Sequence, residues 1–183
     1  MLPPEEDADI PVFCRALGVP GLADIHTHFL PPRMLRRVWE YFDQSGPLVG
    51  VSWPIRYKWD DGERVAHLRS MGVRMFSAQA YAGAPDYDAF LRLAADHERV
   101  ALDTTMIFTD FFDKLAPFPA AALPLARDLG LAGKVLLGSD FPNIPYPYAR
   151  QIGGLVRLSL GDAWLRAVCW ENPVALFGGE LQG

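Results

Sequence analysis

Residues 21–28 have the sequence Gly-Leu-Ala-Asp-Ile-His-Thr-His, in which two histidines end a short apolar run. In a strand, residues i and i+2 point to the same face, so the side chains of His26 and His28 can reach one ion. Asp24 has the same parity and should lie one step deeper on that face. Two histidines on a strand can also face solvent, but the apolar flanking residues favour a buried strand over residues 22–27.

A second apolar run covers residues 134–140, Lys-Val-Leu-Leu-Gly-Ser-Asp, and ends in the carboxylate of Asp140. Two imidazoles and one carboxylate suit a borderline-soft divalent ion, and a catalytic site of this kind keeps one position open for water. We therefore predict that His26, His28 and Asp140 are metal ligands. Zinc is the expected ion and manganese the alternative. Asp140 is also the predicted catalytic residue, because a carboxylate beside the metal is well placed for general base work.

Strands and helices alternate along the whole chain. Apolar runs predict further strands at residues 73–80, 100–104 and 135–138. Helical spacing predicts helices at residues 33–43, 63–71, 86–97, 120–129, 149–158, 163–170 and 173–177. We expect a lead-in segment over residues 1–20, a loop over the site at 46–59 and a rigid loop at 141–148. The alternation indicates an α/β fold with parallel strands, whose carboxyl ends are where such proteins build their sites.

The composition limits the class of protein. The chain has 183 residues, of which 50% are hydrophobic, so we expect one domain over residues 1–183 with a real core. The net charge of −5 does not support nucleic-acid binding, and no run approaches the roughly 20 apolar residues of a membrane helix.

A small-molecule substrate is the expected partner. The chain start lacks the features of a secretory signal, so we expect a cytoplasmic location. Cys14 and Cys169 are expected to be buried small hydrophobes.

Two stretches resemble the amidohydrolase-related metal enzymes. Residues 22–43, with the two histidines and the following Phe-Leu-Pro-Pro-Arg, resemble the opening of that family, and residues 99–177 resemble its closing portion. The most telling parts of the second stretch are Leu102-Asp103-Thr104, Leu137-Gly138-Ser139-Asp140-Phe141-Pro142 and Glu171-Asn172-Pro173. The resemblance implies a (β/α)₈ barrel that uses a divalent metal to activate water. It implies a hydrolase of a small, carboxylated substrate, with a metal-dependent decarboxylase as the alternative.

The chain departs from this family in length. A (β/α)₈ barrel typically takes about 250 residues, whereas this chain has 183 and four predicted strands. The second strand runs directly into what resembles the end of the family's sixth strand or the turn after it, with an apparent junction near residues 80–83. We therefore expect a partial, truncated TIM-type (β/α) barrel with about four parallel strands. In a closed barrel the last strand pairs with the first, so the resemblance places Asp140 beside His26 and His28.

The truncation has two consequences. The missing middle would hold two further active-site histidines of the family, and Tyr81-Ala82-Gly83 stands where the family tends to have a histidine before a glycine. A catalytically inactive, truncated remnant is therefore another alternative function. Removing strands from a barrel exposes sheet edges, which favours association, so a homo-oligomer is an expected alternative to a monomer.

Other polar and aromatic residues have two interpretations each. His67 and His97 are expected to be surface or helix-packing residues rather than ligands. Asp103 ends a predicted strand, where it either faces the site or bonds to the following loop. Asp110 and Asp113 are expected to be loop or cap residues. Arg33 or Arg56 either pairs with a substrate carboxylate or is solvated. A set of aromatic residues either lines a pocket or packs in the core: Trp53, Trp59, Phe108, Phe111, Phe141, Tyr146 and Tyr148.

Overall fold

The computed structural model describes residues 2–28, 32–78, 87–98 and 100–177. In this part of the chain, strand β1 (Leu22–Thr27) pairs in parallel with β2 (Val73–Ala78). Strand β3 (Leu102–Asp103) pairs in parallel with β4 (Val135–Leu136). The strands are short and parallel, as the sequence predicts, and the bounds of β1 agree with the prediction.

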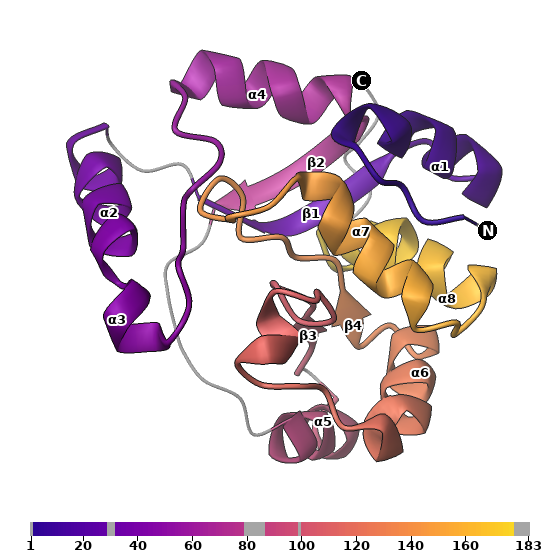
Figure 1. The fold of residues 1–183 in the computed structure, drawn as a ribbon. Helices are drawn as coiled ribbons and strands as arrows, with labels where there is room; N and C mark the ends of the chain where they lie inside the picture. The colour runs from indigo at the N-terminus through magenta and orange to yellow at the C-terminus, as the bar shows by residue number, and fades with distance from the viewer. Residues whose placement is uncertain (1, 29–31, 79–86, 99, 178–183) are drawn as a thin grey trace.

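The segment that follows β4 joins the two pairs of strands. Ile25 N donates a hydrogen bond to Leu137 O (2.8 Å), and His28 N donates to Phe141 O. Thr27 and Phe141 form a parallel bridge. The spatial order is therefore β2, β1, the β4 segment and β3, as Figure 1 shows. This order places the end of the last described strand against the first strand.

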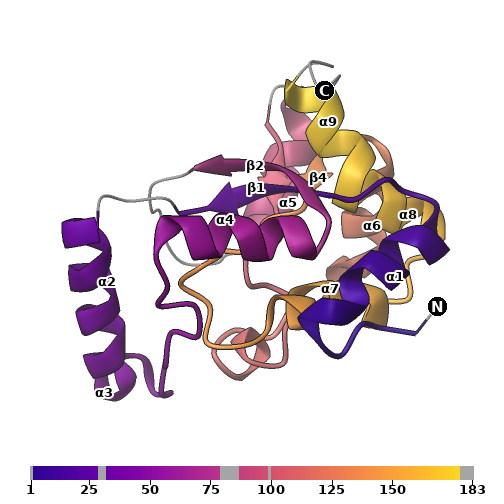
Figure 2. The same cartoon turned by 90° about the horizontal axis from the view of Figure 1, so that it is seen from above.

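Helices connect the strands and cover them. Figure 2 shows α4 along the β1–β2 pair, and α2 with α3 on the side of the molecule away from α8 and α9. The α-helices of the described residues are α1 (Ile10–Leu17), α2 (Pro32–Gln44), α3 (Gly46–Val49), α4 (Asp61–Ser70), α5 (Tyr87–Asp96), α6 (Leu123–Leu131), α7 (Tyr148–Arg157), α8 (Asp162–Arg166) and α9 (Asn172–Phe177). Short 3-10 turns η1 (Asp7–Asp9), η2 (Phe112–Lys114) and η3 (Ala120–Ala122) and a π-helical turn η4 (Ala167–Glu171) complete them.

The structure corrects several predicted boundaries. Helix α1 lies in the predicted lead-in segment, because Ile10, Phe13, Cys14 and Leu17 form one buried helical face. Helix α3 lies in the predicted loop over residues 46–59. Strands β3 and β4 are two residues long each, shorter than predicted. The apparent junction at residues 80–83 lies outside the described residues.

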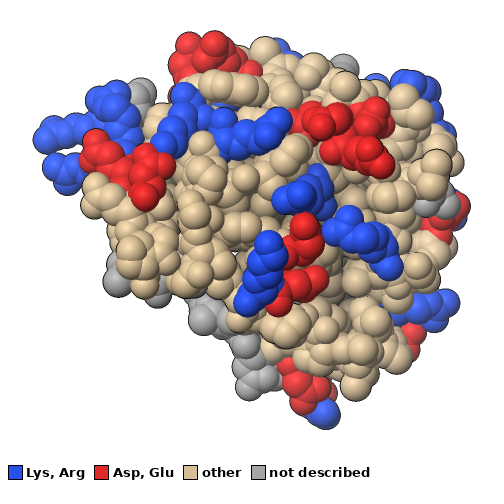
Figure 3. Space-filling model, in the orientation of Figure 1, with Lys and Arg blue, Asp and Glu red and all other residues tan. Residues whose placement is uncertain are grey.

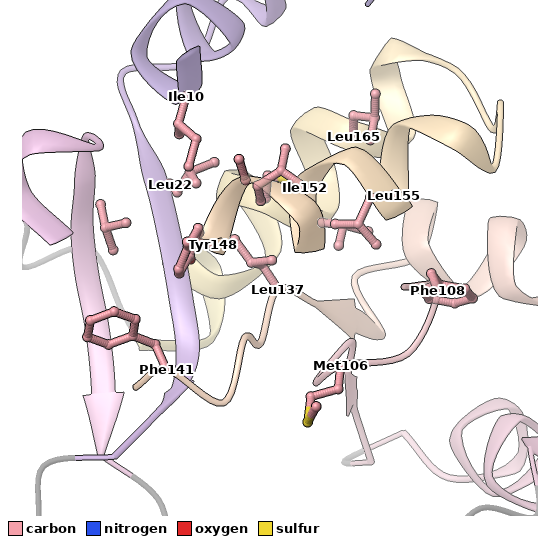
Figure 4. Packing of buried hydrophobic residues seen from close by; sticks show 14 of the residues in the cluster. Ile10, Leu22, Met106, Phe108, Leu137, Phe141, Tyr148, Ile152, Leu155 and Leu165 are labelled. Carbon is pink, nitrogen blue, oxygen red and sulfur yellow. The ribbon is translucent and has the colours of Figure 1, made fainter. Parts of the chain in front are cut away.

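A hydrophobic core fills the space between β1 and the helices that follow β4. Figure 4 shows Leu22, Leu137, Tyr148 and Ile152 between β1 and α7, and each of these side chains is fully buried. Burying one such aliphatic side chain stabilises the fold by about 1.5–3 kcal/mol. The core thus fixes the β4 segment against β1. Cys14 and Cys169 are free and buried, which confirms their predicted role as small hydrophobes.

The surface carries charges of both signs. On the face that Figure 3 draws, Lys and Arg are interspersed with Asp and Glu rather than gathered in one basic patch. Within the described residues, no helix combines the length and apolar character that crossing a membrane requires.

Asp7 ties the N-terminal segment to two distant parts of the chain. Its Oδ2 accepts hydrogen bonds from the Tyr57 hydroxyl (2.6 Å) and from His67 Nε2 (2.8 Å), and its Oδ1 accepts from Ala149 N (2.9 Å). Burial raises the pKa of Asp7, but the hydrogen bonds from these three groups outweigh it, so the pKa lies below its ordinary value. His67 is thus a helix-packing residue, as predicted.

We expect Asp7→Asn to lower the free energy of unfolding by about 1–3 kcal/mol, because charge-assisted hydrogen bonds are lost. The folded pKa lies below the unfolded value of about 3.9. The carboxylate therefore stabilises the fold fully above that value, and its contribution is lost as pH falls through the folded pKa. In urea denaturation, the difference between wild type and variant should be complete at about pH 5 and shrink in more acid solution. A difference that does not change with pH would contradict this assignment.

Candidate metal centre

Three potential ligands meet where β1 and the β4 segment end. His28 Nε2 lies 2.8 Å from Asp140 Oδ1, and His26 Nε2 lies 3.7 Å from the same oxygen. One ligand atom from each residue lies within 4.8 Å of the other two. His28 and Asp140 are 112 positions apart in the chain. The predicted meeting of the three side chains is confirmed, and their role as metal ligands remains a prediction.

The backbone holds Asp140 in place beside β1. Its N–H donates a hydrogen bond to His26 O (2.8 Å), and its carbonyl accepts one from Asn143 N (2.8 Å). The φ angle of Asp140 is +67°, in the left-handed region that residues other than glycine seldom adopt. Such a conformation costs energy and persists where neighbouring contacts fix it, which is common at functional sites.

The environment of Asp140 suits a cation. Its side chain is 3% exposed, and within the described part of the chain its Oδ2 is buried without a hydrogen-bond partner. Burial raises the pKa of Asp140, and the hydrogen bond and charge of His28 oppose that shift only in part. A buried carboxylate oxygen without a partner is costly. Because the neighbouring donors are two imidazole nitrogens, this site fits a divalent ion such as zinc.

Asp24 lies one step deeper than His26 and His28 on the same face of β1, and its hydrogen bonds support the site. Its Oδ1 accepts hydrogen bonds from His26 N (3.0 Å) and Ser139 N (3.1 Å), and its Oδ2 accepts one from the Tyr148 hydroxyl (2.6 Å). Asp24 is fully buried, and this burial raises its pKa to about 6 although the hydrogen bonds lower it. The predicted depth of Asp24 is confirmed. Its partners Ser139 and Tyr148 were not predicted, because strand periodicity carries no signal for such pairs.

Asp103 meets both interpretations that the sequence allows. Its Oδ2 lies 3.1 Å from His26 Nδ1, so it faces the site. Its Oδ1 accepts a hydrogen bond from Thr105 N (2.8 Å), so it also bonds to the loop after β3. Asp103 is not one of the three residues whose ligand atoms converge.

A cavity of about 430 Å³ lies beside this cluster and includes His26, Asp103 and Asp140 in its wall. Its volume falls in the range of about 300–1,000 Å³ that is usual for small-molecule sites. The remaining wall is largely apolar and comes mainly from α5 and from residues of β3 and the segment after it, with single residues from other segments: Trp53, Ala126, Val135 and Trp164. The cavity therefore offers polar groups on one side and an apolar surface elsewhere.

The structure separates the predicted pocket residues into two groups. Trp53 and Phe108 line the cavity. The other predicted aromatic residues lie outside its wall: Trp59, Phe111, Phe141, Tyr146 and Tyr148. Of the two interpretations, core packing holds for Phe141, Tyr146 and Tyr148, which are buried, and for Phe111, which packs against the core, whereas Trp59 is partly exposed. Arg33 and Arg56 are exposed, and no Lys or Arg of the described residues lines the cavity.

The comparison with known families identifies the chain. A family model described as Amidohydrolase matches residues 78–179, more than half of the chain. The chain therefore belongs to the amidohydrolase family, which falls in the TIM-barrel superfamily, is generally metal-dependent and acts on small molecules. The match includes Asp103 and Asp140, whereas His26 and His28 precede it. No curated protein and no solved structure matched the chain.

Proposed function

We propose that this chain is a metal-dependent hydrolase of a small organic substrate, with the ion held by His26, His28 and Asp140. The observation that carries the proposal is the meeting of these three side chains, from distant parts of the chain, beside a cavity of about 430 Å³ whose wall includes His26 and Asp140. Zinc is the ion that this donor set suits best, and manganese is the alternative.

Each residue has a defined task in this proposal. His26 and His28 provide imidazole nitrogens as metal ligands, and they form the side of the site at the end of β1. An ion bound there supplies Lewis acidity, which acidifies water and polarises a substrate oxygen. Asp140 accepts a proton as general base, and its buried, unpartnered Oδ2 supports that role. The apolar wall of the cavity packs against the body of the substrate.

A decarboxylase that uses the same ligands is the second candidate. We propose a carboxylated substrate for either reaction. Because no Lys or Arg of the described residues lines the cavity, the bound ion is the positive charge that would meet this carboxylate. This arrangement favours a carboxyl group at the reacting centre, and so supports decarboxylation as the alternative to hydrolysis.

We propose a partial TIM-type barrel as the fold. The spatial order with the β4 segment beside β1 supports this proposal, because first and last strands pair in a closed barrel. Within the described residues, β2 pairs with β1 alone and β3 with β4 alone. These edges are consistent with a homo-oligomer, and with a weakly active or inactive remnant. The oligomeric state and the cytoplasmic location remain predictions.

We expect Asp140→Asn to lower turnover by at least about 100-fold, because the general base and a charged ligand are both removed. The test incubates the zinc-loaded full chain with a panel of small carboxylated amides, lactones and aromatic acids. Product formation and release of carbon dioxide are followed separately, so that hydrolysis and decarboxylation are distinguished. Asp113→Asn is the matched control, since Asp113 is exposed and lies outside the cavity wall. Turnover in Asp140→Asn equal to that of the control would refute the assigned role.

A further inference from the structure

We propose that Asp103 is the positioning residue for His26, which it holds with Nε2 directed toward the metal ion. This inference rests on the proposed function, because it assigns a task within the same site. Its basis is the contact of 3.1 Å between Asp103 Oδ2 and His26 Nδ1, the ring nitrogen that does not face Asp140.

The chemistry of the contact fixes the ring tautomer. The partner of His26 Nδ1 is a carboxylate oxygen, Asp103 Oδ2, at 3.1 Å, and a carboxylate accepts hydrogen bonds. In a neutral imidazole, His26 Nδ1 therefore carries the hydrogen and donates it to Asp103. The lone pair remains on His26 Nε2, which lies 3.7 Å from Asp140 Oδ1.

Asp103 is itself held in place, so it can impose an orientation on His26. Thr105 N donates to its Oδ1, and its backbone pairs with Leu136 of β4. Because Gly138 has no side chain, it leaves room for Asp103, His26 and Thr105 to meet. A Cβ atom at Gly138 would lie 2.9 Å from Asp103 Oδ1, 2.8 Å from His26 Cβ and 2.6 Å from Thr105 Oγ1. A side chain at this position would therefore displace the pair.

A direct ligand role for Asp103 fits the geometry less well. Its Oδ2 contacts Nδ1 of His26, whereas the convergent group is made by His26, His28 and Asp140. Both of its oxygens already have a partner: Oδ2 contacts His26 Nδ1, and Oδ1 accepts a hydrogen bond from Thr105 N. Histidine ligands of metals generally donate their other ring N–H to a carboxylate or carbonyl, which orients the ring and raises its basicity. Asp103 occupies the place of that partner.

Binding of Co²⁺ tests the inference with a spectroscopic readout. We expect Asp103→Ala to weaken Co²⁺ binding by about 10–100-fold and to change the visible spectrum of the bound ion. Asp103→Asn should lose less affinity, because its amide oxygen can still accept from His26 Nδ1. Asp128→Asn on α6 is the matched control, since this exposed carboxylate lies outside the cavity wall and should leave affinity and spectrum unchanged.

Nitrogen-15 NMR of the metal-free chain, at a pH where His26 is neutral, adds a readout that needs no metal. The wild type should show the hydrogen of His26 on Nδ1, and Asp103→Ala should move part of it to Nε2. A wild-type chain that binds no Co²⁺ would refute the proposed metal site. Wild-type Co²⁺ affinity and spectrum in Asp103→Ala would overturn this inference alone, as would an Nε2–H tautomer in the wild type. If the alanine variant does not fold, the tautomer of His26 in the wild type decides the matter.

Discussion

The double variant His26→Ala, His28→Ala is expected to bind no stoichiometric metal, whereas the wild type should hold about one ion per chain. The reason is that the two imidazoles are two of the three donors that converge. His67 is not expected to replace them, since its Nε2 lies 2.8 Å from Asp7 Oδ2 and His67 is not part of the convergent group. Elemental mass spectrometry of the dialysed protein measures the metal content and checks the result.

The control for this variant is His97→Ala, because His97 is exposed near the end of α5. It removes one imidazole without touching the cluster, and it should retain the wild-type metal content. Circular dichroism shows whether the double variant is folded. A folded double variant that keeps stoichiometric metal would contradict the site.

The second large effect is expected at Asp24. Replacement by alanine should lower the free energy of unfolding by about 3–5 kcal/mol, because three hydrogen-bond donors lose their acceptor and each unsatisfied buried group costs about 1–3 kcal/mol. The groups left without an acceptor are His26 N, Ser139 N and the Tyr148 hydroxyl. Since the hydrogen bonds from Ser139 N and from the Tyr148 hydroxyl join β1 to the β4 segment and to α7, metal affinity should fall with stability.

Asp24→Asn provides a matched comparison for this effect. The asparagine oxygen can still accept from the backbone N–H groups of His26 and Ser139, and the Tyr148 hydroxyl can rotate to accept from the amide. Urea denaturation of both variants gives the free energies. An alanine variant as stable as wild type would show that Asp24 does not hold these segments together.

Local patterns in the sequence were sufficient for β1 and for the spacing of the two histidines. The apolar residues of this strand, and the common parity of Asp24, His26 and His28, depend only on neighbouring residues. The position of Asp140 beside them required the resemblance to a barrel, because no periodicity links residues more than 100 positions apart. The structure confirms the position through the hydrogen bond from Asp140 N to His26 O.

Contacts between side chains from different elements could not be predicted. The hydrogen bond from the Tyr148 hydroxyl to Asp24 and the three hydrogen bonds of Asp7 depend on tertiary packing, which leaves no periodic trace. The same aromatic residue types line cavities and fill cores. The sequence therefore could not show that Trp53 lines the cavity whereas Tyr146 packs in the core. Helix α1 is different, since its apolar residues have helical spacing that the sequence does show.

The central claim is that one ion is bound jointly by the end of β1 and by the segment after β4. Anomalous diffraction at the zinc absorption edge, from crystals of the zinc-loaded full chain, tests it most directly. We predict one strong peak about 2.0–2.2 Å from a nitrogen of His26, a nitrogen of His28 and an oxygen of Asp140. A peak at other residues, or a peak that Asp140 does not contact, would contradict the account.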